Sequence, residues 1–259
     1  MLYIHENNLL KKIETNYKGY GSKIQEFYDK KYLPVKAALT ALSFTEKDKD
    51  AFEKAANIIN KYYNEIDVFS HKYSITSQSK FASTFLEEIS TYLFKDIPEI
   101  KTGEFGVFNK KVYAGLKIDK AKRIALITKD VDFCIGKKVR ISIDGQIPTE
   151  LILPVVAVEV KTYLDATMFG EVKSSSKAIR SASPNSKTYV LMGYKSIADE
   201  HIIAARQDAT LSEMFVLRKN EHSPIDAEAL YLYWHEIVEA INDITTENEI
   251  TVPGKLLRV

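Results

Sequence analysis

The spacing of apolar residues changes near Pro98. Before that point, apolar positions recur every three or four residues, which is the period of an α-helix with one buried face. After it, short apolar or alternating runs separated by polar turns predict β-strands. Two later segments return to the helical period. We therefore expect an N-terminal layer of helices followed by an α/β core with a mixed sheet.

The expected elements follow from this pattern. The helices are a short run at residues 9–13, a segment from Lys23 to Leu42 interrupted near Pro34, one that begins at Thr45–Asp48 and continues to Tyr63, and helices at Ser77–Phe94, Thr167–Ala182 and Pro224–Ile244. The strands are Phe105–Phe108, Val112–Leu116, Ile124–Ile127, Val131–Gly136, Val155–Lys161, Lys187–Tyr194 and Glu213–Leu217, with a turn at Asp144–Gly145. The chain has no linker rich in proline or glycine. We expect residues 1–74 to form a helical region packed on a core at residues 75–259.

The composition is that of an ordinary soluble globular protein, with 45% hydrophobic and 27% charged residues. No run approaches the roughly 20 apolar residues that a membrane-spanning helix needs, and the N-terminus lacks the pattern of a signal peptide. We therefore expect a cytoplasmic protein. The single cysteine, Cys134, excludes an intrachain disulfide, and its place in an apolar strand favours a buried structural thiol.

The net charge of +1 conceals an uneven distribution. Residues 95–195 contain 18 Lys and Arg against 11 Asp and Glu, whereas residues 196–259 contain 5 against 12. A basic central segment is consistent with a cleft that faces phosphates. An uneven but merely solvated surface would give the same counts.

Two predicted strands carry acids within apolar sequence. Glu159 and Lys161 lie two residues apart in the strand Val155–Lys161, so their side chains share one face. Asp132 is likewise an acid set in a short apolar strand, Val131–Gly136. An unpaired buried charge costs several kcal/mol, so these groups need partners or ligands. Two acids and a lysine suit a divalent-metal phosphodiesterase. An ion pair between Glu159 and Lys161 on an edge strand is the alternative interpretation.

These residues resemble the PD-(D/E)XK nuclease superfamily, with Asp132 as the first acid and Glu159-Val160-Lys161 as the second half of the motif. The resemblance extends over roughly residues 75–195, and no proline precedes Asp132. It implies a restriction-endonuclease-like mixed-sheet core. It also implies that Asp132, Glu159 and the carbonyl of Val160 bind Mg²⁺, while Lys161 orients the attacking water or stabilises developing charge. Asp130 shares a face with Asp132 and remains an alternative first ligand.

The family often adds a carboxylate from the helix before the sheet. Glu88 is the matching candidate, because it lies on the apolar face with Phe85 and Tyr92, whereas Glu87 is expected to point outward. A helix-edge acid paired with a lysine is the alternative for Glu88. Further along, a helical face with the residues Lys173, Ser174, Lys177, Arg180 and Ser181 could approach the DNA backbone or be an ordinary solvated surface.

Within the superfamily, the segment around Glu159 is most similar to type II restriction endonucleases, including those related to BbvCI. This resemblance implies sequence-specific cleavage of double-stranded DNA and a cognate methyltransferase in the same restriction–modification system. It also implies a homodimer as the default assembly, with a pair formed with a sister subunit as the alternative. A non-catalytic DNA-binding or scaffold protein, and a repair or junction nuclease of the same superfamily, remain the alternatives.

Overall fold

Helices occupy the first hundred residues and the strands follow them, as the apolar pattern predicts. The structure is a computed structural model that describes residues 2–142, 147–208 and 210–245; the turn expected at Asp144–Gly145 lies outside these residues. The α-helices are α1 (Ile4–Glu14), α2 (Gly21–Phe27), α3 (Leu33–Ala41), α4 (Lys49–Lys72), α5 (Ser83–Phe94), α6 (Pro98–Lys101), α7 (Ala166–Ala182), α8 (Asp199–Asp208) and α9 (Ala227–Thr245). The strands are β1 (Gly106–Phe108), β2 (Val112–Ile118), β3 (Ile124–Lys129), β4 (Phe133–Ile141), β5 (Thr149–Leu164), β6 (Lys187–Lys195) and β7 (Glu213–Val216).

The segment around Pro34 stays helical instead of breaking. A proline inside a helix removes one hydrogen bond and its ring collides with the carbonyl four residues earlier. Here a single π-helical turn, η2 (Tyr28–Tyr32), lies immediately before Leu33 and Pro34. A π turn widens the helix locally, which gives the ring room. The expected interruption is therefore a change in helical type between α2 and α3.

The long strand β5 organises the sheet. On one side it pairs along most of its length with β4 in antiparallel register, and β1 pairs with β4 beyond it. On its other side β5 has two neighbours in succession. Near Ile152 it pairs with β2, which pairs with β3, and from Val156 to Leu164 it pairs in parallel with β6, which pairs with β7. The predicted mixed sheet is thus confirmed.

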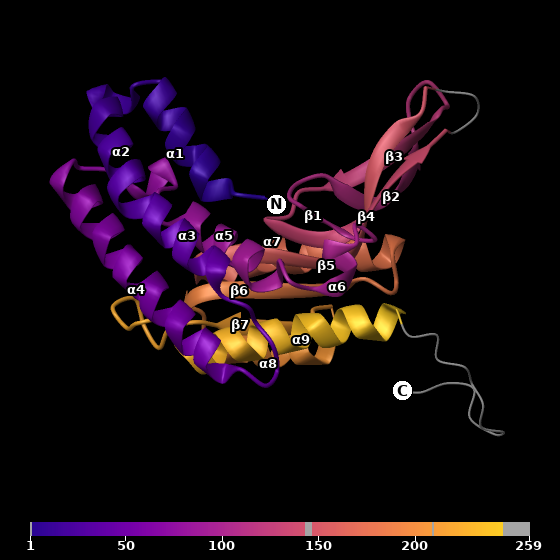
Figure 1. The fold of residues 1–259 in the computed structure, drawn as a ribbon. Coiled ribbons are helices and arrows are strands. Elements are labelled where there is room, and N and C mark those ends of the chain that lie inside the picture. The colour runs from indigo at the N-terminus through magenta and orange to yellow at the C-terminus, as the bar shows by residue number, and fades with distance from the viewer. Residues whose placement is uncertain (1, 143–146, 209, 246–259) are drawn as a thin grey trace.

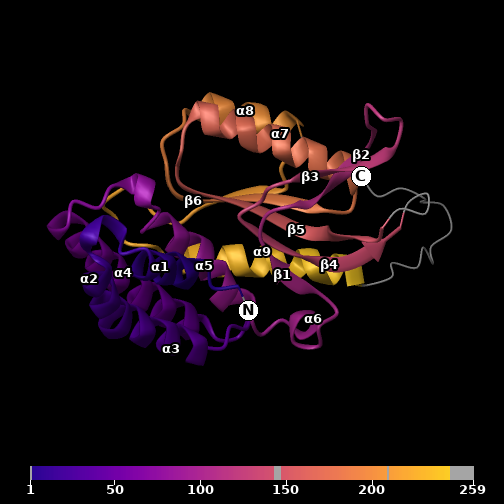
Figure 2. The same ribbon diagram turned by 90° about the horizontal axis from the view of Figure 1, so that it is seen from above.

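Helices cover both faces of the sheet (Figures 1 and 2). On one face α5 and α9 pack against β5, and the N-terminal helices pack outside α5. Val156, Val158 and Val160 belong to the hydrophobic cluster on this face. On the other face α7 covers β2, β5 and β6. Because strand side chains alternate, Glu159 and Lys161 lie on the face of β5 opposite Val158 and Val160.

The N-terminal helices share the main hydrophobic core. One cluster contains Leu9 of α1, Phe52 of α4, Phe85 of α5, Val158 of β5 and Ile241 of α9. Cys134 is fully buried beneath α7 as expected, with an exposed fraction of 0%. Among the described residues, no helix is long and apolar enough to cross a membrane. At the opposite end of the molecule, the β2–β3 hairpin and the neighbouring ends of β4 and β5 project as an arm (Figure 1).

Candidate active site on strands β4 and β5

The register between β4 and β5 brings two of the predicted acids together. Phe133, the first residue of β4, pairs with Val158 in antiparallel register. Asp132 precedes Phe133, and Glu159 follows Val158, so the two acids come level with each other. Lys161 lies two residues further along β5. Three charged groups from two distant segments of sequence therefore meet at one point of the sheet.

Hydrogen bonds tie this cluster together. The carboxylate oxygen Oδ2 of Asp132 accepts hydrogen bonds from the backbone N–H of Val160, at 2.8 Å, and from the ammonium group of Lys161, at 3.3 Å. The same ammonium group donates to Oε2 of Glu159 at 3.0 Å. The side chains of Asp132, Glu159 and Lys161 are 29%, 15% and 26% exposed. A ligand from solvent can therefore reach a cluster that is largely shielded from bulk water.

Burial and the charge of Asp132 disfavour the ionised form of Glu159, and Lys161 partly offsets both effects. Burial raises the pKa of Glu159, Lys161 lowers it, and the charge of Asp132 raises it, with a net upward shift. Burial by itself would lower the pKa of Lys161, but the carboxylates of Asp132 and Glu159 outweigh burial and raise it. The lysine therefore stays protonated between two carboxylates that lie close together.

The donor set fits a hard divalent cation. Two carboxylates on adjacent strands offer the oxygen ligands that Mg²⁺ prefers, and such sites take their remaining ligands from water and substrate phosphate. The described residues contain no group of three or more Asp, Glu, His or Cys that could hold a metal unaided. Asp132 and Glu159 would thus form an open site rather than a closed structural one. Val160 contributes its N–H to Asp132, and a ligand role for its carbonyl stays a prediction.

Asp130, the alternative first ligand, lies apart from this cluster. Its side chain is exposed, and Oδ1 accepts a hydrogen bond from the backbone N–H of Lys111 at 3.2 Å. Asp130 therefore shapes the loop between β1 and β2. Of the two aspartates, the structure brings only Asp132 to Glu159 and Lys161.

The structure does not bring Glu88 to the cluster. Glu88 is fully buried between α5 and the N-terminal helices, where its carboxylate hydrogen-bonds Tyr32 and Tyr92. A place for Glu88 in the cluster would require the face of α5 with Phe85 and Tyr92 to meet the sheet. Instead, α5 lies between the sheet and the helical layer and is buried almost all round. The face that carries Glu88 meets the helical layer.

Its neighbour Glu87, expected to point outward, instead lies within the electrostatic reach of the cluster. Burial and then the charge of Asp132 raise the pKa of Glu87 to about 7, and the positive charges of Lys80, Lys161 and Lys110 oppose the rise. Sequence reasoning missed this residue. A helix that is apolar over most of its surface packs against neighbours on two sides. Consecutive side chains point about 100° apart, so Glu87 and Glu88 face different neighbours of α5.

Lys80 and Lys110 are two further residues that the sequence analysis did not single out. Both act on Glu87 from loops, and both have left-handed backbone, with φ of 58° and 63°. Left-handed backbone is uncommon for residues other than glycine and often marks functional loops. The two lysines therefore place positive charge near Glu87.

The basic face of α7 is a separate feature. The residues that line one groove there, together with Pro184 and Thr210, are Lys173, Ser174, Lys177, Arg180 and Ser181. They occupy one surface as the helical spacing predicts. Their contact with DNA stays a prediction.

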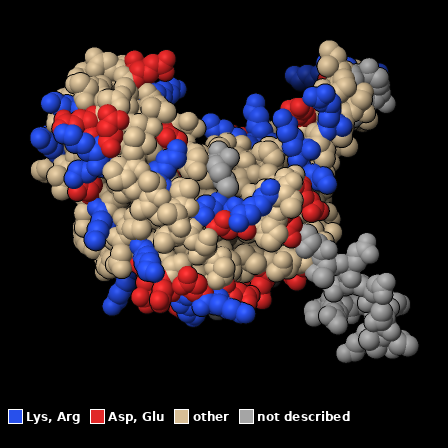
Figure 3. All heavy atoms as spheres, viewed as in Figure 1, with Lys and Arg blue, Asp and Glu red and all other residues tan. Residues whose placement is uncertain are grey.

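A larger hollow separates the N-terminal helices from the β2–β3 arm (Figure 3). Lys and Arg side chains lie on both of its sides and along its floor in this view. A concave surface lined by positive charge attracts a polyanion and raises its local concentration.

Comparison with known proteins agrees with this geometry. No protein of curated function matches the chain in sequence. One chain of native BbvCI, solved as an A2B2 tetramer at low resolution, superimposes with a TM-score of 0.79 at 15% sequence identity. The match covers 95% of this chain and 99% of that chain, so the two share one fold from the N-terminal helices to α9.

The family model of the Bpu10I restriction endonuclease matches residues 78–242. These residues include α5, the whole sheet, the cluster of Asp132, Glu159 and Lys161, and α7. Because the match covers more than half of the chain, this protein belongs to the Bpu10I restriction endonuclease family and is a type II enzyme that cuts double-stranded DNA at specific sequences.

Proposed function

We propose that Asp132, Glu159 and Lys161 form the centre that hydrolyses the DNA phosphodiester, with Mg²⁺ as the metal. The observation that carries the proposal is the single contact network in which Lys161 bridges the two carboxylates. Restriction endonucleases in general use divalent metal ions, and two carboxylates suit Mg²⁺ better than a softer metal. When bound, the metal would polarise the phosphate and acidify a water molecule.

Residues of this chain would bind the metal and stabilise the developing charge. Asp132 and Glu159 supply oxygen ligands at an open position. Lys161, whose protonated form the two acids favour, would turn toward the phosphate and stabilise the charge that develops there. Glu87 takes the place that the sequence analysis gave to Glu88, because its carboxyl lies in the field of Asp132 and Lys161. A cation bound beside Glu87 would lower its pKa and favour the ionised carboxylate.

The DNA would lie in the hollow between the N-terminal helices and the β2–β3 arm. The positive charge around this hollow supports the placement (Figure 3). Lys80 and Lys110, whose charges act on Glu87, also support it. Contacts from several lysines to phosphates would give binding that weakens steeply with salt. A cognate methyltransferase that protects the same sequence in the host belongs to the proposal.

Two aspartates two residues apart provide the sharpest test of the centre. Asp132→Asn should reduce Mg²⁺-dependent cleavage of the DNA strand that this chain cuts at least a thousandfold, an order-of-magnitude figure for the loss of a group that stabilises the transition state. Asp130→Asn should cleave like the unaltered protein, because the side chain of Asp130 hydrogen-bonds the β1–β2 loop. Glu159→Gln should match Asp132→Asn.

Circular dichroism and a DNA-binding assay in Ca²⁺ would confirm that each variant is folded and still binds. Normal cleavage by Glu159→Gln would remove the cluster from the reaction. Strong loss in Asp130→Asn together with normal cleavage by Asp132→Asn would show that the metal ligand had been assigned to the wrong aspartate. Equal rates with Mg²⁺ and with EDTA would overturn the role of the metal.

A further inference from the structure

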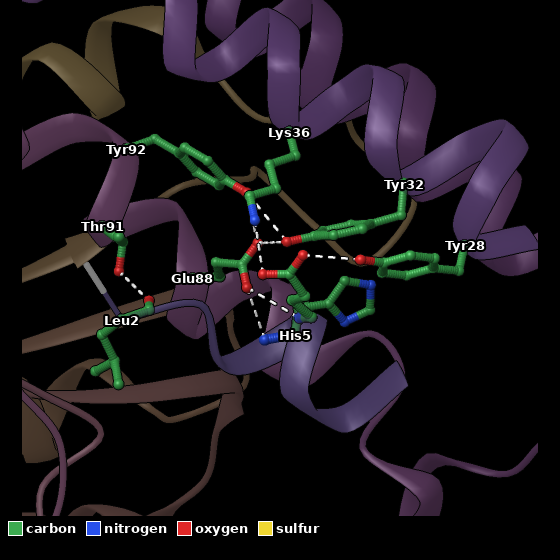
Figure 4. A network of polar contacts seen from close by, with 9 residues as sticks. Leu2, His5, Tyr28, Tyr32, Lys36, Glu88, Thr91 and Tyr92 are labelled. Carbon is green, nitrogen blue, oxygen red and sulfur yellow. Dashed lines mark hydrogen bonds and ion pairs between the residues drawn. The ribbon is translucent and has the colours of Figure 1, made fainter. Parts of the chain in front are cut away.

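The buried carboxylate of Glu88 caps a helix to which it does not belong (Figure 4). Its oxygen Oε2 accepts hydrogen bonds from the backbone N–H groups of His5, at 2.8 Å, and of Glu6, at 3.1 Å. Both groups belong to the first turn of α1, and the preceding residue Tyr3 provides no side-chain cap. A helix N-terminus has unpaired N–H groups and a positive dipole end, so a carboxylate there satisfies both.

The other oxygen of Glu88 is occupied as well. Oε1 accepts hydrogen bonds from the hydroxyl groups of Tyr32, at 2.8 Å, and Tyr92, at 2.6 Å. Four donors therefore surround one carboxylate, which has about four lone-pair positions. Such a network has a single low-energy arrangement, because any rotation of the carboxylate leaves a buried donor unpaired.

Two further bonds fix the same face of α5 to the start of the chain. The hydroxyl of Thr84 is 3.0 Å from Nδ1 of His5, and the hydroxyl of Thr91 donates to the carbonyl of Leu2 at 2.6 Å. Thr84, Glu88 and Thr91 are spaced by four and three residues, so they form one stripe along α5. Three anchors on one stripe determine both the rotation of α5 about its axis and its position along that axis.

The anchored stripe fixes the rotation of α5 and therefore the directions of the other side chains on this helix. Glu87 precedes Glu88, so its side chain leaves the helix about 100° away from the anchored stripe, given 3.6 residues per turn. The charges of Asp132 and Lys161 act on Glu87 in this orientation. A shift of a reacting or ligating group by about 1 Å can reduce a rate on the order of a hundredfold.

We propose that Glu88 is a positioning residue for the cleavage reaction: by capping α1 it locks α5 in the rotation that presents Glu87 to the centre at Asp132 and Lys161. This inference rests on the proposed role of Glu87. Glu88 itself contacts neither metal nor DNA. The helical layer thus contributes to the orientation of α5, together with its packing against β5.

A double-mutant cycle tests the proposal. Glu88→Gln keeps the shape of the side chain but turns one acceptor into a donor that faces existing donors. We expect kcat for plasmid cleavage in Mg²⁺ to fall about ten- to a hundredfold, with less than about a twofold change in the Kd for cognate DNA in Ca²⁺. In a Glu87→Gln background, Glu88→Gln should lower kcat by less than about twofold further, because its effect passes through Glu87.

Ser90→Ala is the matched control. Ser90 is equally buried on α5, and its hydroxyl is 2.9 Å from that of Tyr233 on α9, away from α1. This change should lower the melting temperature while kcat stays the same. If Glu88→Gln fails to fold, Tyr32→Phe removes one of the four donors to Glu88 and takes its place in the cycle.

The outcomes separate the two proposals. If Glu87→Gln cleaves normally, the proposed role of Glu87 fails. If Glu87→Gln is impaired while Glu88→Gln or Tyr32→Phe has normal kcat, the positioning role alone is overturned. Fully multiplicative effects of the Glu87 and Glu88 changes would also overturn it, because Glu88 would then act independently. A non-multiplicative cycle with unchanged DNA affinity is the supporting result.

Discussion

Glu88 is fully buried and Glu87 partly buried in the folded chain, but only Glu88 gains hydrogen-bond donors in return. Burial raises the pKa of Glu88, and bonds from Tyr92, Glu6, Tyr32 and His5 counteract the rise. Among the described residues, no donor hydrogen-bonds Glu87, and the negative charge of Asp132 adds to the effect of burial. The hydrogen bonds therefore offset part of the cost of burying the Glu88 carboxylate, whereas the partial burial of Glu87 has no such compensation.

This cost gives a prediction for the metal-free protein. The pKa of Glu87 is about 7 in the folded chain, against about 4.3 in an unfolded chain. Between these pH values the folded state binds more protons than the unfolded state, so stability falls as the pH rises. Glu87→Gln cannot ionise and should be more stable above pH 7 by on the order of 2 kcal/mol, a gain that disappears toward pH 4.

Urea unfolding in EDTA at several pH values measures this difference. Glu53→Gln, at an exposed position on α4, is the control and should stay within about 0.5 kcal/mol at every pH. A Glu87→Gln variant that is less stable than the original at pH 8 would contradict the assigned environment of Glu87.

At the scale of elements, the strands were predictable because their signal is local. Alternation within Val155–Lys161 and the acid before Phe133 are properties of a few consecutive residues, and they located the cluster on β4 and β5. The orientation of α5 was not predictable in this way. It depends on α1 and the sheet, which lie far away in the sequence. Helix α8 was not predicted either, since its apolar periodicity is weak.

The length and pairing of β5 were also beyond sequence reasoning. The expected strand began at Val155, whereas β5 begins at Thr149 and pairs with β4 through residues on both sides of Pro154. The register shifts between Ile135 and Gly136, opposite this proline. An irregularity of this kind sets the register of all later pairs, including the one that brings Asp132 level with Glu159.

Two glycine substitutions test this account of the irregularity. A Cβ atom at Gly136 would collide with the carbonyl oxygen of Leu153 in the β5 backbone, whereas one at Gly170 in α7 would meet no atom within 4 Å. Gly136→Ala should therefore destabilise the protein by about 2 kcal/mol or more through overpacking. Gly170→Ala should stabilise it by about 0.5–1 kcal/mol, since alanine favours a helix interior.

Thermal unfolding of both variants gives the comparison. Cleavage should fall in Gly136→Ala beyond the loss of folded protein, because a displaced β4 separates Asp132 from Glu159. If Gly136→Ala proved as stable and active as the original, the tight approach of β4 and β5 would have no part in holding the site.

For the whole molecule, the number of sites decides how a duplex can be cut. The chain has one cluster of two acids and a lysine among its described residues, and the two strands of DNA run antiparallel. A double-strand cut at one place therefore needs a second site, most simply one supplied by a second subunit related by a two-fold axis. The sequence alone left a homodimer and a pair with a sister subunit open. The BbvCI chain that shares this fold comes from an A2B2 tetramer, an assembly of two kinds of subunit.

If this chain pairs with a sister subunit, it supplies one of two different cutting sites and makes no double-strand cut alone. The purified chain, incubated with supercoiled plasmid and Mg²⁺, should give no linear product at any concentration, and addition of the sister subunit should produce it. In the complete assembly, Glu159→Gln in this chain should leave the other site intact. The mixed enzyme should then convert supercoiled plasmid into circles nicked in one strand, and sequencing should place every nick on the same strand. If the purified chain forms a particle of twice its monomer mass and gives linear product, it is instead a homodimer that cuts a nearly symmetric site.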